Sequence, residues 1–479
     1  MRTSATGERA QFGLRRADRE RLQRHAERAV RRARRHGEAL ASITVALADD
    51  VDPTAVIAAS RRAGESWFAL EQPDAGRFAL AAAGCVRAIE PAGADRFSAA
   101  ARTWRTLAAE AVADPFDGPR GSGPVALGGF AFAPAGGRTA AWEGFAPASL
   151  HVPEVSFARH GHEVRMTLTV LAHPDDDPEA LAGKAAARAD ELRALPLPLL
   201  DPSPVDQPRV GGAMPPEHYT AAVERAVERI RAGELEKIVL AREVVVHAAA
   251  PHDAPAVIGV LREAFPSCFT FAVGRGSSTF IAATPELLVR REGLRASTLA
   301  LAGTTRRSAD PAVDDHLGEQ LLRSAKERSE QDIVTRRIEK TLGPHAVWVA
   351  AAEEPVVVKM ANVQHLATPI RAQLRQPIGA VELAGALHPT PAVGGEPFAV
   401  AEPLIPALEG MDRGWYAGPV GWTDALGDGE FCVALRCALL AGRAAHCYAG
   451  VGVVADSDPQ AELDETEAKF GALLPVLSA

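Results

Sequence analysis

Two short acidic motifs, far apart in the chain, each place two glutamates three residues apart. Glu462 and Glu465 precede Lys469 in the segment Ala-Glu-Leu-Asp-Glu-Thr-Glu-Ala-Lys, and Glu327 and Glu330 repeat the three-residue step. In a helix such spacings share one face, so each motif offers a carboxylate pair and the later one adds an ammonium group. Two such helices could hold one hard divalent cation and promote a metal-assisted reaction on an acidic small molecule. An ordinary surface ion pair between Glu465 and Lys469 explains the later motif equally well.

Two further ionisable residues stand in apolar surroundings that would suit them to proton transfer. Lys237 opens a predicted strand over 237–246. Every following position through Leu240 is apolar, so the strand is expected to be buried on both faces. Glu286 lies at a proline-marked bend between two apolar strands. Burial favours the neutral forms of both side chains, which makes Lys237 a candidate base and Glu286 a candidate acid. Taken alone, each is more simply a residue whose charge reaches water.

Glycine turns, an arginine and a histidine complete the residues that could bind an anion. Gly303, followed by Thr304, and Gly450 lie in turns whose bare backbone N–H groups could hold a carboxylate. Arg436, placed in a predicted strand, needs an anionic partner, either a structural carboxylate or a ligand. His365 could contact a ligand. A tight turn explains each glycine more simply, and a hydrogen-bonded core position does the same for the histidine.

Apolar periodicity and turn residues predict the elements that must position these groups. Strands are expected at 42–47, 125–132, 163–172, 237–246, 268–273, 279–283, 287–291, 295–301, 348–358, 430–440 and 447–454. Helices are expected at 178–195, 217–232 and 316–342, with a last helix that begins at Pro459. Strands outnumber helices and many are joined by short turns, which predicts an α+β fold with mixed or antiparallel sheets.

The chain divides by composition into three regions. Residues 1–40 carry twelve arginines and five acids and are expected to form a solvated helix or tail. Residues 41–200 show no catalytic spacing, and the proline-rich stretch 196–214 is expected to connect them to 215–477, where the chemical motifs lie.

Composition limits the classes of protein that fit. The net charge of −9 argues against nucleic-acid binding, and no segment approaches the ~20 apolar residues of a membrane span. Five cysteines without a Cys-x-x-Cys pair, and no secretory signal, are typical of a reduced cytoplasmic protein. A monomer is expected.

In their order along the chain, these residues resemble the chorismate-utilising enzyme family, which includes anthranilate, aminodeoxychorismate, salicylate and isochorismate synthases. The likeness spans about 215–477. Two segments make it specific: Leu-His-Pro-Thr-Pro-Ala-Val-Gly-Gly from Leu387, which resembles the isochorismate synthase signature, and Arg-Gly-Trp-Tyr-Ala-Gly-Pro-Val-Gly-Trp from Arg413.

The resemblance implies two facing sheets with flanking helices and a buried site between them, with residues 41–200 completing the sheets. It implies Mg²⁺ as cofactor and chorismate as substrate. Lys237 would activate water for attack at C2, and Glu286 would protonate the leaving C4 hydroxyl. Glu330 and Glu465 would bind Mg²⁺ directly, with Glu327 and Glu462 in support. The implied substrate contacts are Arg436, Tyr416, Lys469, the backbone at Gly303 and Gly450, and the pocket-lining Thr304 and His365.

The resemblance also indicates which branch of the family this is. Anthranilate synthases usually carry a glutamine or another non-basic residue where this chain has Lys237, and aminodeoxychorismate synthases carry a lysine where it has Ala302. Water is therefore the expected nucleophile, without a glutaminase partner. Salicylate synthase, which goes on to eliminate pyruvate, is the main alternative, and an idle chorismate-binding protein is another. The sequence at 390–397 favours release of isochorismate, for menaquinone or siderophore synthesis, with menaquinone favoured. Gln331 and Leu463 depart from the family's usual His and Trp.

Overall fold

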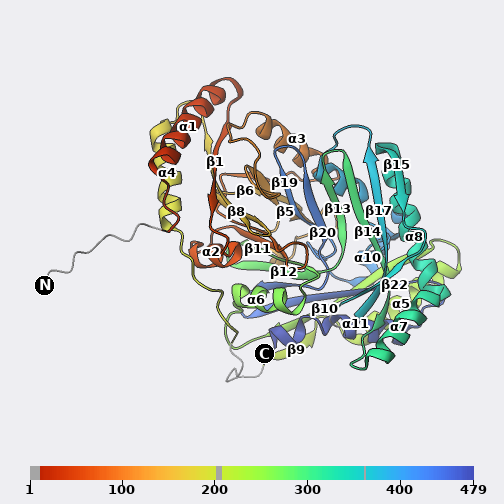
Figure 1. The fold of residues 1–479 in the computed structure, drawn as a ribbon. Coiled ribbons are helices and arrows are strands. Elements are labelled where there is room, and N and C mark those ends of the chain that lie inside the picture. Colours follow the sequence, from red (N-terminus) through yellow and green to blue (C-terminus); the bar gives the residue numbers. More distant parts are fainter. Residues whose placement is uncertain (1–10, 201–207, 361–362, 479) are drawn as a thin grey trace.

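Two large antiparallel sheets form the centre of the protein, and helices surround them (Figure 1). The computed structural model describes residues 11–200, 208–360 and 363–478. Within these ranges one sheet has twelve strands and the other has ten. The predicted α+β class is therefore confirmed. No helix in the described ranges combines the length and apolar character that a membrane span requires.

The twelve-stranded sheet combines strands from both halves of the chain. Its central pairing joins β2 to β11, and its far end joins β22 to β10. In spatial order its strands are β1 (Ala39–Leu47), β8 (Glu163–Ala172), β7 (Val155–His160), β3 (Phe78–Ala83), β2 (Trp67–Gln72), β11 (Phe269–Arg275), β12 (Ser278–Thr284), β21 (Cys437–Ala441), β22 (Ala444–Val453), β10 (Lys237–His247) and β18 (Gly395–Glu396), with β9 (Arg209–Gly212) also paired to β10.

The ten-stranded sheet also combines strands from both halves of the chain, since β5 pairs with β19. In spatial order its strands are β15 (Ala346–Ala351), β17 (Val363–Leu374), β14 (Arg295–Arg306), β13 (Leu287–Glu292), β20 (Gly429–Val433), β19 (Pro419–Asp424), β5 (Val125–Phe130), β6 (Ala148–Val152) and β4 (Arg87–Ile89), with β16 (Val356–Lys359) also paired to β17.

Helices lie against the outer sides and ends of the sheets (Figure 1). They are α1 (Arg16–His36), α2 (Pro53–Ser60), α3 (Arg96–Ala109), α4 (Pro178–Glu191), α5 (Pro216–Arg231), α6 (Ala254–Ala264), α7 (Pro311–Arg323), α8 (Ala325–Leu342), α9 (Ala380–Leu387), α10 (Phe398–Glu409), α11 (Pro459–Phe470) and α12 (Leu474–Leu477), with 3-10 turns at Ala140–Trp142 and Gly343–His345.

Apolar side chains fill both faces of the twelve-stranded sheet. On β12, Phe280 belongs to the core between the sheets, whereas the next residue, Ile281, belongs to the core beneath the outer helices. The two sheets meet directly where Phe78 of β3 stacks on Trp422 of β19, with ring centroids 6.2 Å apart. Burial on both faces explains why these strands read as continuous apolar runs.

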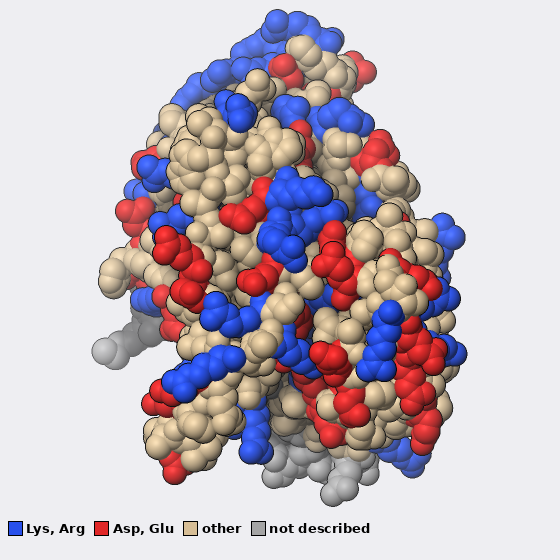
Figure 2. All heavy atoms as spheres, turned by 90° about the vertical axis from the view of Figure 1, so that its right-hand side faces the viewer, with Lys and Arg blue, Asp and Glu red and all other residues tan. Residues whose placement is uncertain are grey.

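The N-terminal helix α1 has one buried face despite its arginines. Leu22, Ala26, Val30 and Ala33 are buried, and the helix packs on β1 and α4. Residues 1–10 of the arginine-rich region lie outside the described residues. Figure 2 shows basic and acidic side chains mixed over the face on the right of Figure 1, with basic side chains along the upper rim.

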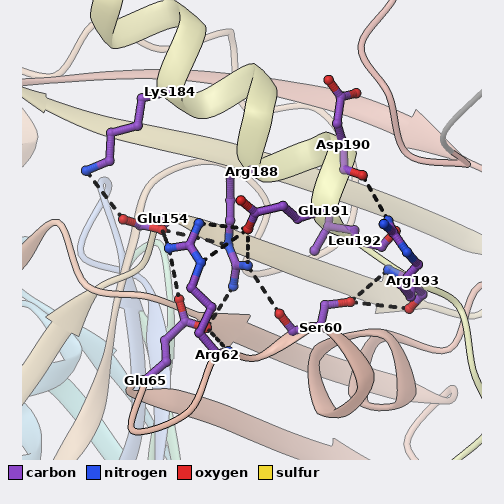
Figure 3. Close-up of polar contacts among 10 residues, drawn as sticks. All are labelled: Ser60, Arg62, Glu65, Glu154, Lys184, Arg188, Asp190, Glu191, Leu192 and Arg193. Atoms are coloured by element: carbon purple, nitrogen blue, oxygen red, sulfur yellow. Dashed lines mark hydrogen bonds and ion pairs between the residues drawn. The ribbon is translucent and has the colours of Figure 1, made fainter.

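An ion network fixes the end of α4 to the twelve-stranded sheet (Figure 3). Arg188, only 2% exposed, lies 2.8 Å from Glu65, 3.2 Å from Glu191 and 3.7 Å from Glu154. Arg62 also reaches Glu154 and Glu191. A buried arginine that serves three carboxylates makes this network structural.

Four predicted segments contain a break or a strand that was not predicted. The helix predicted at 316–342 is divided at Ser324, whose side chain caps α8 by accepting a hydrogen bond from the backbone N–H of Glu327. The strand predicted at 348–358 is divided into β15 and β16. The connection 196–214 contains β9, although residues 201–207 lie outside the described residues.

The fourth correction affects the site. The strand predicted at 430–440 is two strands in different sheets, β20 and β21. Arg436 lies in the crossing between them, with φ of 47°, and not within a strand. Because the chain has to turn from one sheet to the other, Arg436 adopts a left-handed conformation that is uncommon for a side-chain-bearing residue.

Candidate active site

One cavity between the sheets gathers nearly all of the predicted site residues. Its empty space, which includes the solvent at its open mouth, is about 820 Å³. Twelve of the thirteen predicted residues line it, and Lys237 lies directly behind the wall. The lining members are Glu286, Gly303, Thr304, Glu327, Glu330, His365, Tyr416, Arg436, Gly450, Glu462, Glu465 and Lys469.

Chain crossings between the sheets place two of these groups. Glu286 lies where the chain leaves β12 of one sheet and enters β13 of the other, and Arg436 lies at the reverse crossing. The crossings are adjacent, because the N–H of Val433 donates to the carbonyl of Glu286 and the N–H of Ala283 donates to the carbonyl of Arg436. Both side chains therefore reach the space between the sheets.

Lys237 is fully buried at the first residue of β10. Its Nζ lies 2.6 Å from Oε1 of Glu330, an ion-pair distance, although the atoms are not aligned for a hydrogen bond. Gly452 on the neighbouring strand β22 provides the space for this pair. A Cβ at residue 452 would lie 2.5 Å from Oε1 of Glu330 and 2.8 Å from Cε of Lys237.

Glu286 is the buried carboxyl of the site, at 3% exposure. Burial raises its pKa to about 8, against the smaller opposing effects of the Lys237 and Lys469 charges. The two ammonium groups therefore lie close enough to act on this carboxyl. A carboxyl with this pKa is largely protonated at neutral pH and can donate a proton.

The four glutamates come from the first turns of α8 and from α11, whose N-terminus is capped by Asp458. Each has a positively polarised partner. Glu465 lies 2.8 Å from Lys469, Glu462 lies 3.2 Å from Lys326, and Glu327 accepts a hydrogen bond from the backbone N–H of Thr304. In the described residues no three acidic, histidine or cysteine side chains converge into a complete ligand set.

The chemistry of this donor set nevertheless fits a hard divalent cation. All four groups offer oxygen, which is the ligand Mg²⁺ prefers. Burial, with a smaller contribution from the neighbouring Glu330 charge, raises the pKa of Glu327 to about 7. Burial likewise raises the pKa of Glu462. These shifts mark a concentration of negative charge that a cation would offset, once carboxylates now facing lysines turn toward it.

Basic and aromatic residues, among them Lys469 of α11 itself, form another part of the cavity wall. Lys469 donates through Nζ to the carbonyl of Gly450 at 2.8 Å, which holds the ammonium beside the strand. Tyr416 stacks on Tyr448 with centroids 5.3 Å apart, and burial raises the pKa of the Tyr416 phenol. Arg436 and His365 join this side, with Nε2 of His365 3.0 Å from a guanidinium nitrogen. This wall suits an anionic ligand.

Sequence reasoning gave no role to three further site residues. Lys326 and Tyr448 line the cavity, and Gly452 makes room for the buried ion pair. Only their positions in the sequence could have indicated them, because Lys326 precedes Glu327, and Tyr448 and Gly452 lie on either side of Gly450. Gln331, the departure from the family pattern, is buried away from the cavity and donates to the carbonyl of Ala300 and the hydroxyl of Thr368.

Sequence and structure comparisons relate this chain to known enzymes. The model of the family described as chorismate binding enzyme matches residues 24–478. The chain is 39% identical over 434 residues to the salicylate biosynthesis isochorismate synthase of Pseudomonas aeruginosa, which covers 90% of this chain and 89% of that protein. It is 34% identical over 359 residues to isochorismate synthase MenF of Bacillus subtilis, with 74% of each chain covered. The solved structure of MenF, the menaquinone-specific isochorismate synthase from Escherichia coli, matches with a TM-score of 0.78 at 27% identity, over 96% of this chain and 100% of that one.

Proposed function

Since this chain belongs to the chorismate binding enzyme family, we propose that it is an isochorismate synthase, which isomerises chorismate by adding water at C2 and losing the C4 hydroxyl. One observation supports this reaction at the level of individual residues. A fully buried lysine, Lys237, and a buried carboxyl with a raised pKa, Glu286, act on the same cavity between the sheets.

Proton transfer is assigned to these two residues. Lys237, once its ammonium has given up a proton, takes a proton from the water molecule as the oxygen of that water bonds to C2. The ring double bonds shift as the C4–oxygen bond breaks, and Glu286 gives its proton to the departing hydroxyl, which leaves as water. The proton then passes from Lys237 to Glu286 to restore the starting state. The reverse reaction uses the same groups with their roles exchanged.

Glu330 and Glu465 would hold Mg²⁺ directly, and Glu327 and Glu462 would support it. The ion would supply positive charge that binds a substrate carboxylate in place. Each of three glutamates also has a lysine partner: Glu330 faces Lys237, Glu465 faces Lys469 and Glu462 faces Lys326.

The anionic substrate would lie between the acid and the basic wall. Arg436 and Lys469 supply positive charge, Tyr416 and Thr304 supply hydroxyl groups, and the backbone at Gly303 and Gly450 supplies hydrogen bonds. His365 completes the lining. Fixed charges of this kind reduce the cost of orienting a dicarboxylate for reaction.

Two features favour isochorismate as the released product. Residues 390–397 differ from the salicylate synthase pattern, and the relatives above are named isochorismate synthases. With water as nucleophile, we propose a chain that acts without a glutaminase subunit and as a monomer. We assign the catalytic role to residues 215–477 and a structural role in both sheets to residues 41–200.

Product analysis tests the proposal. Purified protein with chorismate and Mg²⁺ should give isochorismate as the new chromatographic peak, with no pyruvate detected by lactate dehydrogenase and NADH. Equal release of salicylate and pyruvate would instead identify a salicylate synthase. Binding of chorismate without any product would identify an idle binding protein. Lys237→Ala should abolish turnover while the protein stays folded, and unchanged turnover would remove the assigned base.

A further inference from the structure

His365 contacts three other residues of the cavity wall. Its Nε2 lies 3.0 Å from a guanidinium nitrogen of Arg436. Its Nδ1 lies 3.2 Å from the carbonyl oxygen of Gly303 and 3.1 Å from Oγ1 of Thr304. The ring is 5% exposed, so these contacts account for both nitrogens.

The partners fix where the proton of the imidazole lies. A guanidinium donates and cannot accept, so Nε2 must present a lone pair to Arg436. A backbone carbonyl accepts and cannot donate, so Nδ1 must carry the hydrogen. The ring is therefore neutral. The chemistry of the pocket agrees, because burial, together with the charges of Arg436 and Lys469, lowers the pKa of His365 well below its ordinary value.

A bulge in β14 creates the acceptor for Nδ1. The register of β14 against β17 shifts between Ala302 and Thr304, and Gly303 has φ of 69° at that point. A Cβ there would lie 3.0 Å from Oε2 of Glu327, so the position suits glycine in both conformation and space. The bulge directs the Gly303 carbonyl to the ring of His365 on the paired strand.

We propose that His365 is a positioning residue, a neutral imidazole protonated on Nδ1 that orients the Arg436 guanidinium and makes the Thr304 hydroxyl a hydrogen-bond donor toward the cavity. Because Oγ1 of Thr304 shares the Nδ1 hydrogen as an acceptor, the hydroxyl hydrogen is directed to another acceptor. The guanidinium then offers only donors to a ligand, and the hydroxyl offers its hydrogen while one of its lone pairs is occupied by Nδ1. This pair selects a carboxylate, which accepts at both oxygens, over a carboxamide, which must also donate.

The inference rests on the proposed function for the identity of its ligand, a carboxylate of chorismate. His365 itself acts through Arg436 and Thr304 and takes no part in proton transfer. Its loss should therefore weaken substrate binding far more than it slows the chemical step.

Three substitutions distinguish the contact made by Nε2 of His365 from the contacts made by Nδ1. His365→Gln places an amide oxygen near the position of Nε2, where it can accept from Arg436. His365→Asn places its amide near Nδ1 and cannot reach Arg436, and His365→Phe removes both contacts. We expect the KM for chorismate to rise about tenfold in the Phe and Asn variants, with kcat changed less than about threefold, and to return to within about threefold of the original in the Gln variant. A loss confined to kcat, or equal effects of Gln and Asn, would overturn the inference. Thermal unfolding of all three variants verifies folding.

A double-mutant cycle tests the route through Arg436. In an Arg436→Gln background, His365→Phe should change KM by less than about twofold, because the group it orients is already gone. An undiminished tenfold effect in that background would show that His365 acts on the substrate by another route.

The proton position can be measured without turnover. Nitrogen-15 NMR of protein labelled at histidine, with His365→Phe to assign the signal, should show a neutral ring protonated at Nδ1 at pH 7. A ring protonated at Nε2, or a charged ring, would refute the inference whatever the reaction proves to be. Conversely, an Nδ1–H ring in a protein that makes no isochorismate would leave the tautomer standing and remove the proposed function.

Discussion

Gly452→Ala should disable the site while sparing the fold. The added Cβ would lie 2.5 Å from Oε1 of Glu330, 2.8 Å from Cε of Lys237 and 3.2 Å from its Nζ. These atoms belong to the ends of two side chains and not to the backbone, so the side chains can swing away. The strand can stay in place, but the Lys237–Glu330 pair at 2.6 Å cannot.

The two effects differ in size. Displacing a reacting group by about 1 Å costs on the order of 100-fold in rate, or about 2.7 kcal/mol of transition-state stabilisation. On stability, replacing glycine restricts the unfolded chain by about 0.4–1 kcal/mol, which offsets part of the ~1–3 kcal/mol typical of overpacking. We therefore expect kcat to fall about 100-fold, with the free energy of unfolding changed by no more than about 2 kcal/mol.

Steady-state kinetics and urea unfolding of the same preparation measure both quantities. Gly183→Ala is the matched control, because Gly183 lies in α4 with nothing within 4 Å of an added Cβ. It should keep full activity. If Gly452→Ala turned over within about threefold of the unsubstituted protein, the pair would not need its present geometry, and the role of Lys237 as base would have to be abandoned.

Further predictions concern the acid, the cation and the ion network. Turnover should fall as pH rises through about 8, since Glu286 must be protonated to donate a proton. Glu286→Gln should lower kcat about 1,000-fold, and its plot of kcat against pH should lack this decline. Because the folded pKa of Glu286 is raised, its contribution to stability is present at low pH and is lost as pH rises from about 4.5 through about 8, so Glu286→Gln should show a smaller decline of melting temperature over that range than the unsubstituted protein. Chelation of divalent ions should abolish turnover and added Mg²⁺ should restore it, with a Mg²⁺-dependent rise in melting temperature that is absent in Glu330→Gln; activity that survives chelation would rule out the cation. Arg188→Ala should lower the free energy of unfolding by about 2–3 kcal/mol, without changing kcat of the folded protein, since it removes a buried guanidinium from carboxylates that keep only the half-exposed Arg62 and the exposed Lys184 as partners; a stability loss below about 1 kcal/mol would contradict the structural role of the network.

The sequence predicted the chemistry better than the path of the chain. The glutamates at 327, 330, 462 and 465 were recognisable because helical spacing is local, and the structure places them on one cavity. The strands β10 to β14 and β22 were also predicted, because their apolar runs are bounded by turn residues, whereas β17, β18 and β19 were not predicted. Within residues 39–172 the strands β2, β3, β4, β6 and β7 were not predicted, and β2 takes one of its neighbours, β11, from a distant segment.

The failures share a physical cause. Apolar residues continue through 430–440, so nothing in the periodicity reveals that β20 ends and β21 begins in another sheet. The division of 316–342 at Ser324 has neither proline nor glycine and depends on a side-chain cap. Gly452 was given no role from the sequence, because its role follows from the Lys237 and Glu330 side chains that lie beside it in three dimensions.

The interleaved sheets have a consequence for biosynthesis. About 290 residues separate the end of β5 from β19, the strand beside it, and a ribosome needs about 15–60 s to make them at ordinary speeds. Throughout that interval β5 can pair with β6, but its other edge has left the exit tunnel without a partner, a state prone to aggregation. Yield on heterologous expression should therefore depend on chaperone supply and growth temperature, and a fragment that starts near residue 215 should be recovered in inclusion bodies.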